Sequence, residues 1–363
     1  MMPLHNFTPG SIVIVSPLDI PHRESDLRVG IDRAKRLIVG DMKNDVLNGR
    51  IYKMLKESGR MGVPKTVVII PFYNEIHKLL RSIQSLTSQT MLPGMVILVD
   101  DCGTEPLLPA IPETLEKAGI QCLVVRNPTN MGPGGSRQTG FALTPPDTDY
   151  VIFLDSDDFL SVDFIKECVR VHQLRPDIMA TYGNSVNILD GKNRIHLNDE
   201  KYDNLLDGIL NTRKWGTGAL MWKFHQVRDI RWESYRCVED SHFELSAALI
   251  NPNIAYVDSA TLYIEQSFES ERLVRRNRNI RTPDTPFRHR LYDRLLKNYT
   301  FQTPDSKKKS YLKRTVHHWI RHAQLGLTGY LKTIWSFVLM GKANVAIWMV
   351  FYIPHFIDQY RRN

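Results

Sequence analysis

Four short apolar segments, separated by helical stretches, constrain the fold of this chain more than any other feature. They are rich in β-branched residues and lack polar alternation: residues 66–71 (TVVIIP), 95–100 (MVILVD), 120–126 (IQCLVVR) and 150–155 (YVIFLD). The stretches that separate them, 75–88, 112–118 and 135–143, have the pattern of helices. Because strands without polar alternation are covered on both faces, we predict an α/β fold with a Rossmann-like, mostly parallel sheet and helices on both faces.

The two ends of the chain differ from this central region. Residues 1–63 contain a short β-like run at 12–15 and a polar helical stretch at 24–58, and we interpret them as an N-terminal extension. Residues 64–266 form the predicted α/β domain. Residues 267–363 read as a basic loop followed by a helical C-terminal segment.

Positive charge is concentrated near the C-terminus. The chain has a net charge of +8, and residues 271–321 contain 15 Lys or Arg against 4 Asp or Glu. Such a block favours anionic partners: phospholipid, a phosphorylated substrate or nucleic acid. It lacks regularly interleaved aromatic residues and any nucleic-acid-reading motif, so we expect no nucleic acid partner.

The cysteines and the N-terminus indicate where the protein works. The four cysteines are scattered singly, which disfavours a zinc site or a disulfide framework and favours a reducing compartment: Cys102, Cys122, Cys168 and Cys237. The first residues lack the charged and apolar regions of a signal peptide. We therefore predict a cytoplasmic protein.

Residues 334–353 are apolar over the length of a membrane helix, but Lys342 lies near their middle. A central Lys costs roughly 2.5–3.5 kcal/mol on insertion. A helix lying on anionic lipid, at the inner face of the membrane, fits this pattern better. Packing on the α/β domain or on a second copy of the chain, in a homo-oligomer, and membrane spanning are the alternatives.

The sharpest chemical signal is LDSDD at residues 154–158, directly after the last apolar segment. Asp155 and Asp157 can face one ligand, and oxygen ligands of this kind suit Mg²⁺ or Mn²⁺. The alternative is an Asp-rich turn that caps the following helix.

The other predicted strands also end in groups that suit a nucleotide diphosphate. PFYNE at 71–75 offers an aromatic ring and an amide, and Asp100 and Asp101 can accept hydrogen bonds from a base or a ribose. The sequence NMGPGGSRQTGF at 130–141 is a glycine-rich loop that runs into a helix bearing Arg137. Glycines let the backbone approach a ligand, and an arginine can neutralise an anion. Neither a P-loop nor a dinucleotide-binding fingerprint is present.

In order along the chain, these motifs resemble those of family-two glycosyltransferases. The counterparts of the family's P-x-Y-N-E, V-D-D, Gly/Arg-loop and D-x-D-D motifs are IIPFYNE, LVDDCGTE, NMGPGGSRQTG and FLDSDD. WGTGALMWK (215–223) and VEDSHFELSAAL (238–249) match the family's acceptor loop and its Glu-Asp pair. The resemblance covers residues 65–266 and implies the GT-A fold.

The resemblance implies an inverting, metal-dependent enzyme of the hexosyltransferase type. A sugar would move from a nucleotide-sugar donor, a UDP-sugar in this family, to a hydroxyl of a glycan, glycolipid or other acceptor. Asp240 would be the catalytic base, supported by Glu239, and Asp155 and Asp157 would hold Mn²⁺ or Mg²⁺. Arg137 would brace the diphosphate or Asp157. The implied nucleotide-binding residues are Pro71, Tyr73, Glu75, Asp100, Asp101, Asn130, Gly132, Arg137, Asp155 and Ser156.

The chain departs from the family pattern after its last predicted strand. Many members have a histidine there, whereas this chain has Glu265 and Gln266, followed by a cluster of arginines. We predict that these arginines close over the diphosphate, with a solvated basic loop as the alternative: Arg272, Arg275 and Arg276.

Three other functions are weighed against this one. A sugar nucleotidyltransferase would have a basic glycine-rich loop after the first strand, where IIPFYNE stands. A polyprenyl-phosphate sugar synthase usually follows its metal motif with Asp-Leu-Gln rather than Asp-Asp. A non-enzymatic basic adaptor for membrane or nucleic acid, built on residues 271–321, leaves the acidic strand ends unexplained.

Overall fold

A computed structural model gives the structure of the chain and describes residues 12–14, 65–189, 193–196, 200–210, 215–235 and 238–266, with the single residues 294, 331, 334, 335, 338, 346, 349 and 350. The predicted helical stretch at 24–58 and the arginines Arg272, Arg275 and Arg276 lie outside these residues, as does most of the C-terminal segment. Within the described part of the chain, no helix is long and apolar enough to cross a membrane.

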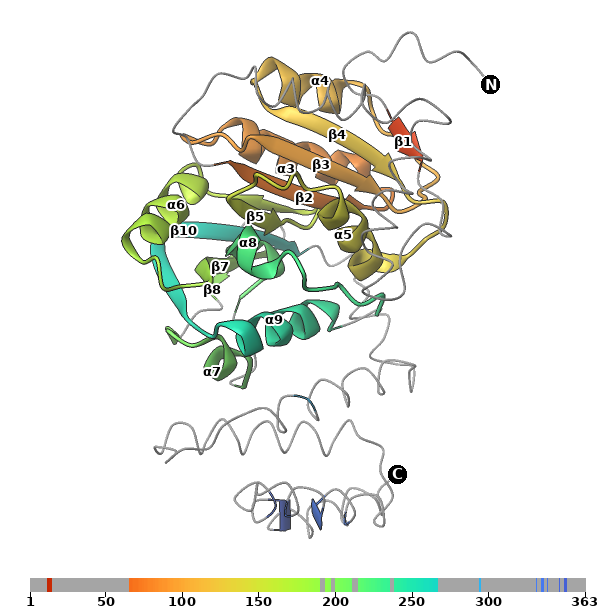
Figure 1. Cartoon of the computed structure of the whole chain (residues 1–363). Helices are drawn as coiled ribbons and strands as arrows, with labels where there is room; N and C mark the ends of the chain where they lie inside the picture. The colour runs from red at the N-terminus through yellow and green to blue at the C-terminus, as the bar shows by residue number, and fades with distance from the viewer. Residues whose placement is uncertain are drawn as a thin grey trace.

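Strands and helices alternate from Thr66 onward, as the apolar segments predict (Figure 1). The strands are β1 (Ile12–Ile14), β2 (Thr66–Phe72), β3 (Met95–Asp100), β4 (Gln121–Arg126), β5 (Tyr150–Phe153), β6 (Asp158–Leu160), β7 (Ala180–Leu189), β8 (Asn193–His196), β9 (Leu220–Lys223) and β10 (Ile254–Gln266). The helices are α3 (Ile76–Thr87), α4 (Ala110–Lys117), α5 (Gly132–Ala142), α6 (Phe164–Leu174), α7 (Leu205–Leu210), α8 (Phe224–Val227) and α9 (Glu239–Ile250), with a 3₁₀ turn η2 (Thr217–Ala219).

The strands form one sheet in the order β1-β4-β3-β2-β5-β9-β7-β10-β6, and β8 pairs with β7. The first five strands of this order are mutually parallel. Strand β9 runs antiparallel to both β5 and β7, so the second half of the sheet is mixed. The predicted α/β fold is confirmed, with its parallel half built from the apolar segments identified in the sequence.

Strand β1 brings part of the N-terminal extension into this sheet. Ile12 pairs with Val124 and Ile14 with Arg126, in parallel with β4. Residues 12–14 of the β-like run therefore form an edge strand, and the sheet extends beyond residues 64–266.

The chain order places helices on both faces of the parallel half. From β2 the chain moves through α3 and α4 to β3 and β4, and then returns through α5 to β5 on the other side of β2. Right-handed crossovers put α3 and α4 on one face and α5 on the other, and Figure 1 shows α5 in front of the sheet. The direction of the chain through the sheet reverses between β2 and β5, and in open α/β sheets ligands bind at the carboxyl ends of the strands at such a point.

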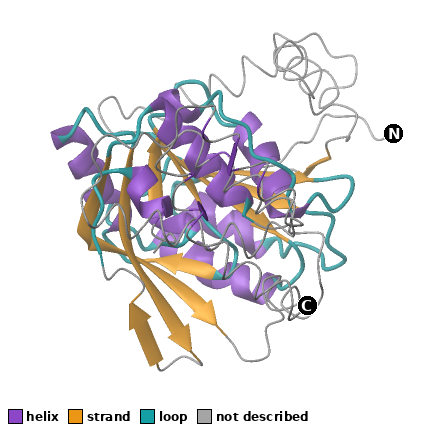
Figure 2. Cartoon of the chain, turned by 90° about the horizontal axis from the view of Figure 1, so that it is seen from below, coloured by secondary structure: helices purple, strands orange, loops and turns teal. Residues whose placement is uncertain are grey.

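Close packing fixes α5 on the sheet. A Cβ atom on Gly140 would lie 2.5 Å from Ile69 Cγ2 and 3.1 Å from Val99 Cγ2, so a glycine lets the helix approach β2 and β3. Beside it, Phe141 and Phe153 make an edge-on contact in the core. Seen from below, the helices lie against the strands, and a group of strands extends beyond them at one end (Figure 2).

Candidate functional site

The polar motifs of the parallel strands meet at one edge of the sheet. Phe72 pairs with Asp100, and Asp100 pairs with Arg126, so β2, β3 and β4 end side by side. Strand β5 is in register with β2 through the Ile69–Phe153 pair. The residues that follow each strand therefore lie at one edge of the sheet, around the carboxyl ends of β2 and β5.

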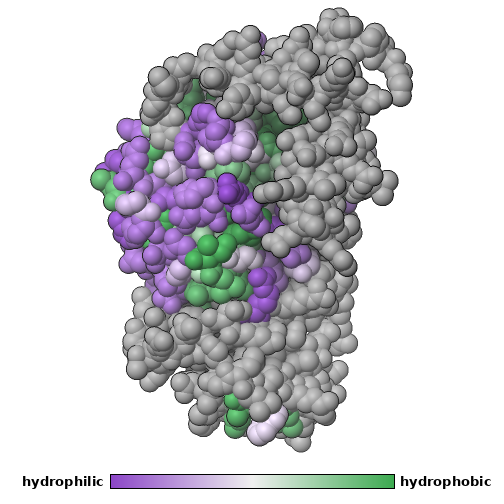
Figure 3. Space-filling model, viewed as in Figure 1, coloured by the Kyte–Doolittle hydropathy of each residue, from purple (hydrophilic) through white to green (hydrophobic). Residues whose placement is uncertain are grey.

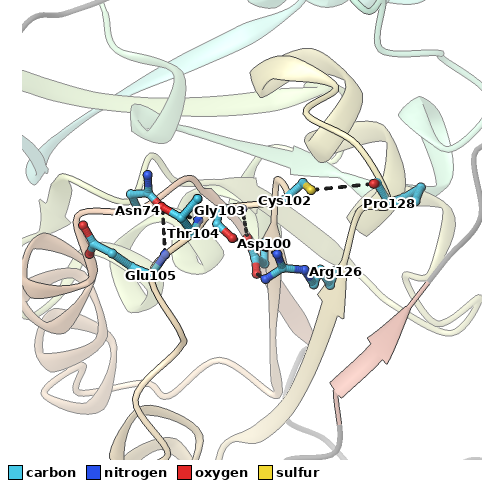
Figure 4. Close-up of polar contacts among 8 residues, drawn as sticks. All are labelled: Asn74, Asp100, Cys102, Gly103, Thr104, Glu105, Arg126 and Pro128. Atoms are coloured by element: carbon cyan, nitrogen blue, oxygen red, sulfur yellow. Dashed lines mark hydrogen bonds and ion pairs between the residues drawn. The ribbon is translucent and has the colours of Figure 1, made fainter.

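The turn after β2 is tied to the turn after β3 by Asn74, as Figure 4 shows. Asn74 Oδ1 accepts hydrogen bonds from the backbone amides of Thr104 (2.7 Å) and Glu105 (3.0 Å). Asn74 and the following residue, Glu75, both have left-handed φ values, 55° and 52°. Tyr73 is 50% exposed, so its ring is open to a ligand.

Pro71 and Glu75, the other predicted nucleotide-binding residues of this motif, differ in their exposure. Pro71 is buried in the strand, where it pairs with Val99. The Glu75 carboxylate is exposed and pairs with Lys78 at 2.6 Å. A direct role for either residue in nucleotide binding stays a prediction.

Asp100 shapes the β3 turn. Its Oδ2 accepts from Arg126 Nη1, and its Oδ1 accepts from the amide of Gly103 at 2.8 Å. The same arginine donates to the carbonyl of Gly103 at 2.7 Å (Figure 4). Cys102 lies in this turn with a left-handed φ of 63°, and its thiol donates to the carbonyl of Pro128. Asp100 thus holds the turn, and the contact with a base that the resemblance implies stays a prediction.

Asp101 anchors the glycine-rich loop. Its Oδ1 accepts from Asn127 Nδ2 (3.0 Å) and from the amide of Met131 (2.8 Å), and its Oδ2 accepts from the amide of Gly132 (2.8 Å). Burial raises the pKa of Asp101, while these hydrogen bonds act in the opposite direction. Asn127 also donates to Ser136 Oγ at 2.8 Å, which links the loop to α5.

Helix α5 begins at Gly132, earlier than the predicted 135, because Pro133 is compatible with the first turn of a helix. Gly132 has a left-handed φ of 74°, and a Cβ atom placed on it would meet no other atom within 4 Å, so it borders open space. At Gly134, in contrast, a Cβ atom would lie 2.1 Å from the carbonyl oxygen of Glu233. Gly134 therefore allows close packing against the backbone of Glu233 and does not border open space. Asn130 is exposed just before the helix.

Arg137 connects the end of β5 with the start of α9. It is 3% exposed, and it donates through Nη2 to Asp155 Oδ1 (2.5 Å) and through Nη1 to Glu239 Oε1 (2.9 Å). Its guanidinium lies 4.9 Å from the centre of the Trp232 ring. Burial alone lowers the pKa of Arg137, but the carboxylates of Asp155, Glu239 and Asp240 raise it above its usual value. Three predicted site carboxylates therefore gather around one buried cation.

The Glu-Asp pair opens α9 after Val238, whose φ of 55° is left-handed. Glu239 is buried; burial and the neighbouring Asp240 raise its pKa, and Arg137 opposes the shift. Asp240 is partly exposed, and its Oδ2 accepts from Thr217 Oγ1 at 3.2 Å. The positive end of the helix dipole favours carboxylates in this first turn.

The turn after β5 presents Asp155, Ser156 and Asp157, all partly exposed. Ser82 of α3 holds this turn by donating to the carbonyl of Ser156 at 2.9 Å. The described residues contain no cluster of three His, Cys, Asp or Glu that encloses a metal ion. Two partly exposed carboxylates fit Mg²⁺ or Mn²⁺, which complete their shell with water and substrate phosphate oxygens.

A cavity of about 520 Å³ lies beside α9. Its lining includes Tyr235, His242, Ser246 and Arg294, and the arginine donates to Ser246 Oγ at 3.0 Å. Viewed as in Figure 1, the described surface is largely hydrophilic, with an apolar patch toward its lower edge (Figure 3). His242 and Ser246 occupy a different side of α9 from Asp240, so this cavity and the Asp240–Thr217 contact lie on different faces of the helix.

Comparison with known proteins identifies the domain. Residues 67–229 match the family model described as Glycosyl transferase family 2. This part of the chain resembles that family. The chain is 35% identical over 102 residues to the succinoglycan biosynthesis protein ExoW of Rhizobium meliloti, covering 28% of this chain and 32% of ExoW. It is 30% identical over 105 residues to the poly(ribitol-phosphate) beta-N-acetylglucosaminyltransferase TarS of Staphylococcus aureus, covering 28% of this chain and 18% of TarS. The chain thus spans less than half the length of these relatives.

Solved structures extend the likeness to the fold. The crystal structure of S. aureus TarS 1–349 with UDP-GlcNAc has a TM-score of 0.55 and 20% identity, over 81% of this chain and 80% of that one. The complex of the same protein with UDP has a TM-score of 0.52 and 18% identity, over 74% and 78%. At this identity the likeness concerns the fold, and it agrees with the GT-A fold that the motifs imply.

Several residues of the site were not found from the sequence. Asn127 directly follows the third apolar segment, so its place beside Asp101 could have been inferred from the strand order. Thr217 lies in the recognised WGTG loop, but its contact with Asp240 carries no sequence signal. The same is true of Trp232 beneath Arg137.

Proposed function

We propose that this protein is an inverting glycosyltransferase that uses a divalent metal ion, Mn²⁺ or Mg²⁺. It transfers a sugar from a nucleotide-diphosphate donor, a UDP-sugar, to a hydroxyl of a glycan, a lipid-linked glycan or another acceptor. The observation that carries the proposal is the gathering of Asp155, Glu239 and Asp240 around the buried Arg137. This arrangement puts Asp155, one of the two proposed metal ligands, near the partly exposed carboxylate of Asp240. The names of TarS and ExoW, and the UDP-GlcNAc bound to TarS, support a sugar nucleotide as donor.

The donor would lie at the carboxyl ends of β2 and β5. Asp155 and Asp157 would hold the metal ion, which when bound neutralises charge on the diphosphate. The exposed ring of Tyr73 offers a face for the base, and Gly132 leaves space beside the start of α5. Asp100 and Asp101 would act at this edge by keeping the turns around the nucleotide in place.

Asp240 would act as the general base. Its carboxylate takes the proton of the acceptor hydroxyl while the acceptor oxygen forms a bond to the anomeric carbon. The bond from that carbon to the diphosphate oxygen breaks on the opposite face, and its electron pair leaves with UDP. One displacement of this kind inverts the anomeric configuration. A general base contributes about 10²–10⁴-fold to such a rate, and Thr217 holds one oxygen of this base.

The test is the release of UDP from UDP-GlcNAc in the presence of Mn²⁺, with Asp240→Asn as the variant. We expect the rate to fall by about 10²–10⁴-fold while the Kd for UDP stays unchanged. Asp229→Asn is the control, because Asp229 is highly exposed and pairs with the neighbouring Arg228. An Asp240→Asn variant that retains turnover, or that loses UDP binding to the same extent, contradicts the role of Asp240.

The basic block at residues 271–321 supports a second part of the proposal, which concerns where the enzyme works in the cell. Residues 271–321 and 334–353 would hold the cytoplasmic enzyme on an anionic membrane surface. Flotation with vesicles that contain anionic lipid tests this, comparing the full chain with a variant in which Lys307, Lys308 and Lys309 are changed to Glu. Equal flotation of both proteins contradicts electrostatic attachment.

A further inference from the structure

A buried carboxylate on α9 has no part in the reaction just described. Glu244 is 2% exposed and lies four residues after Asp240, so both side chains are on the same side of the helix. Its Oε1 accepts a hydrogen bond from Trp215 Nε1 at 3.3 Å. Burying a carboxylate is costly unless it is hydrogen-bonded, so this contact is favourable. It links α9 to the segment that begins at Trp215.

The indole of Trp215 has a fixed place in the core. A Cβ atom on Gly208 of α7 would lie 2.1 Å from Cη2 of the ring, so α7 approaches the indole through a glycine. The rings of Tyr182 and Tyr202 pack on it, with centroids 5.1 and 5.9 Å away. The Nε1–H group is therefore aimed at Glu244 by packing from several elements.

The residues after Trp215 pass close to the donor side of the site. The amide of Gly216 donates to Ser185 Oγ at 3.0 Å, which holds this segment on β7. A Cβ atom on Gly218 would lie 2.9 Å from Leu154 Cδ1, and Leu154 directly precedes the Asp155 turn. The segment 215–219, which we call the clamp loop, is thus packed between the proposed metal-binding turn and α9.

The clamp loop reaches α9 at two points. Trp215 donates to Glu244, and Thr217, two residues later, donates to Asp240. On the helix these acceptors are one turn apart. Two contacts fix both the distance and the rotation of the loop relative to α9. The amide and hydroxyl of Ser241 hold Asp240 Oδ1 from within the helix, at 2.6 and 3.3 Å, and Thr217 holds Oδ2 from the clamp loop.

We propose that Glu244 is a positioning residue for the reaction: by holding Trp215 it fixes the clamp loop, and the loop fixes the base Asp240 through Thr217. This inference rests on the proposed function. Glu244 itself would contact neither donor nor acceptor. A glutamine at this position keeps an oxygen that accepts from the indole, whereas a methionine has a similar length and loses it.

The experiment measures kcat and KM for the release of UDP from UDP-GlcNAc with Mn²⁺ in wild-type protein and in Glu244→Met, Glu244→Gln and Trp215→Phe. A small misplacement of a reacting group costs on the order of 10²-fold. We expect kcat to fall about 10- to 100-fold in Glu244→Met and Trp215→Phe, with KM and the Kd for UDP unchanged. Glu244→Gln should stay close to wild type. Ser246→Ala, on another side of α9, is the matched control and should also be unchanged.

The decisive comparison places Glu244→Met in the Asp240→Asn background. If Glu244 acts through the base, its loss has no further effect on kcat there. A similar fall in both backgrounds, or a fall in UDP affinity that matches the fall in kcat, overturns the positioning role and assigns Glu244 to general stability. If Glu244→Met does not fold, Trp215→Phe, which retains an aromatic ring, is compared in the same two backgrounds with the same criteria.

Failure of the inference and failure of the proposed function give different results. Activity that depends on Asp240 but is unaffected in Glu244→Met and Trp215→Phe overturns the inference alone. Wild-type protein that releases no UDP from UDP-GlcNAc or other UDP-sugars, or activity that persists in Asp240→Asn, overturns both.

Discussion

Replacing Arg137 with methionine tests the centre of the site most severely. The guanidinium is 3% exposed and separates the carboxylates of Asp155 and Glu239, with ion-pair distances of 2.5 and 2.9 Å. Methionine fills much of the space but leaves two acidic groups at the same place without a counter-charge. Removing one partner of a buried ion pair costs about 3–5 kcal/mol, so we expect a loss of that size in the free energy of unfolding at pH 7.

Urea unfolding measures this loss, and a surface pair provides the control. Arg170 pairs with Glu167 on α6 at 3.0 Å and is 61% exposed, so Arg170→Met should cost less than about 1 kcal/mol. Combining Arg137→Met with Glu239→Gln should restore part of the loss, because only one carboxylate then remains. The loss in Arg137→Met should also shrink as the pH falls, since burial and Asp240 already raise the pKa of Glu239 and Arg137 no longer opposes them. Equal costs for the two arginine variants, or additive effects of Arg137→Met and Glu239→Gln, would refute this reasoning.

Three further predictions concern the protein around the site. Burial lowers the pKa of His172 from 6.5 to about 4, so the unfolded chain binds the proton more tightly than the folded one. The contribution of neutral His172 to the free energy of unfolding is therefore fully present above pH 6.5. It falls by roughly 3 kcal/mol as the pH drops toward 4. His172→Gln should flatten that part of the stability curve measured by urea unfolding. Gly140→Ala should cost about 1–3 kcal/mol by overpacking against Ile69, whereas Gly94→Ala, with its nearest neighbour at 3.7 Å, should cost much less in the same thermal-unfolding series. Burial raises the pKa of the partly buried Cys122 and of the buried Cys168 to about 12. Mass spectrometry should therefore find both thiols unmodified by iodoacetamide at pH 8, and rapid labelling of either would contradict the raised pKa values.

The parallel half of the fold was predictable because its strands carry their own signal. Segments 66–71 and 95–100 are apolar at nearly every position, and only burial on both faces accommodates that pattern. Strand β9 gave no such signal, since four residues that pair antiparallel between β5 and β7 are too few to show a period. The N-terminal strand β1 was recognised as β-like, but its pairing with β4 depends on a contact between distant parts of the chain.

The candidate site also has features that could be predicted from the sequence and features that could not. Strand ends are sequence features, so Asp100, Asp101 and Asp155 could be placed at one edge from the order of the strands. The ordered family motifs added Asp240. The sequence does not tell which group each side chain contacts. Arg137, for example, is predicted to brace the diphosphate or Asp157, whereas in the structure it lies between Asp155 and Glu239. Such pairings arise from packing across α5, β5 and α9.

The most direct test of the central claim, that this edge of the sheet holds a metal ion and a nucleotide diphosphate, is calorimetric titration of UDP with and without Mn²⁺. The account predicts that wild-type protein binds UDP much more tightly in the presence of Mn²⁺, that Asp157→Ala abolishes this dependence, and that Asp240→Asn preserves it. UDP affinity that is absent under all conditions, or a response to Mn²⁺ that survives in Asp157→Ala, would contradict it.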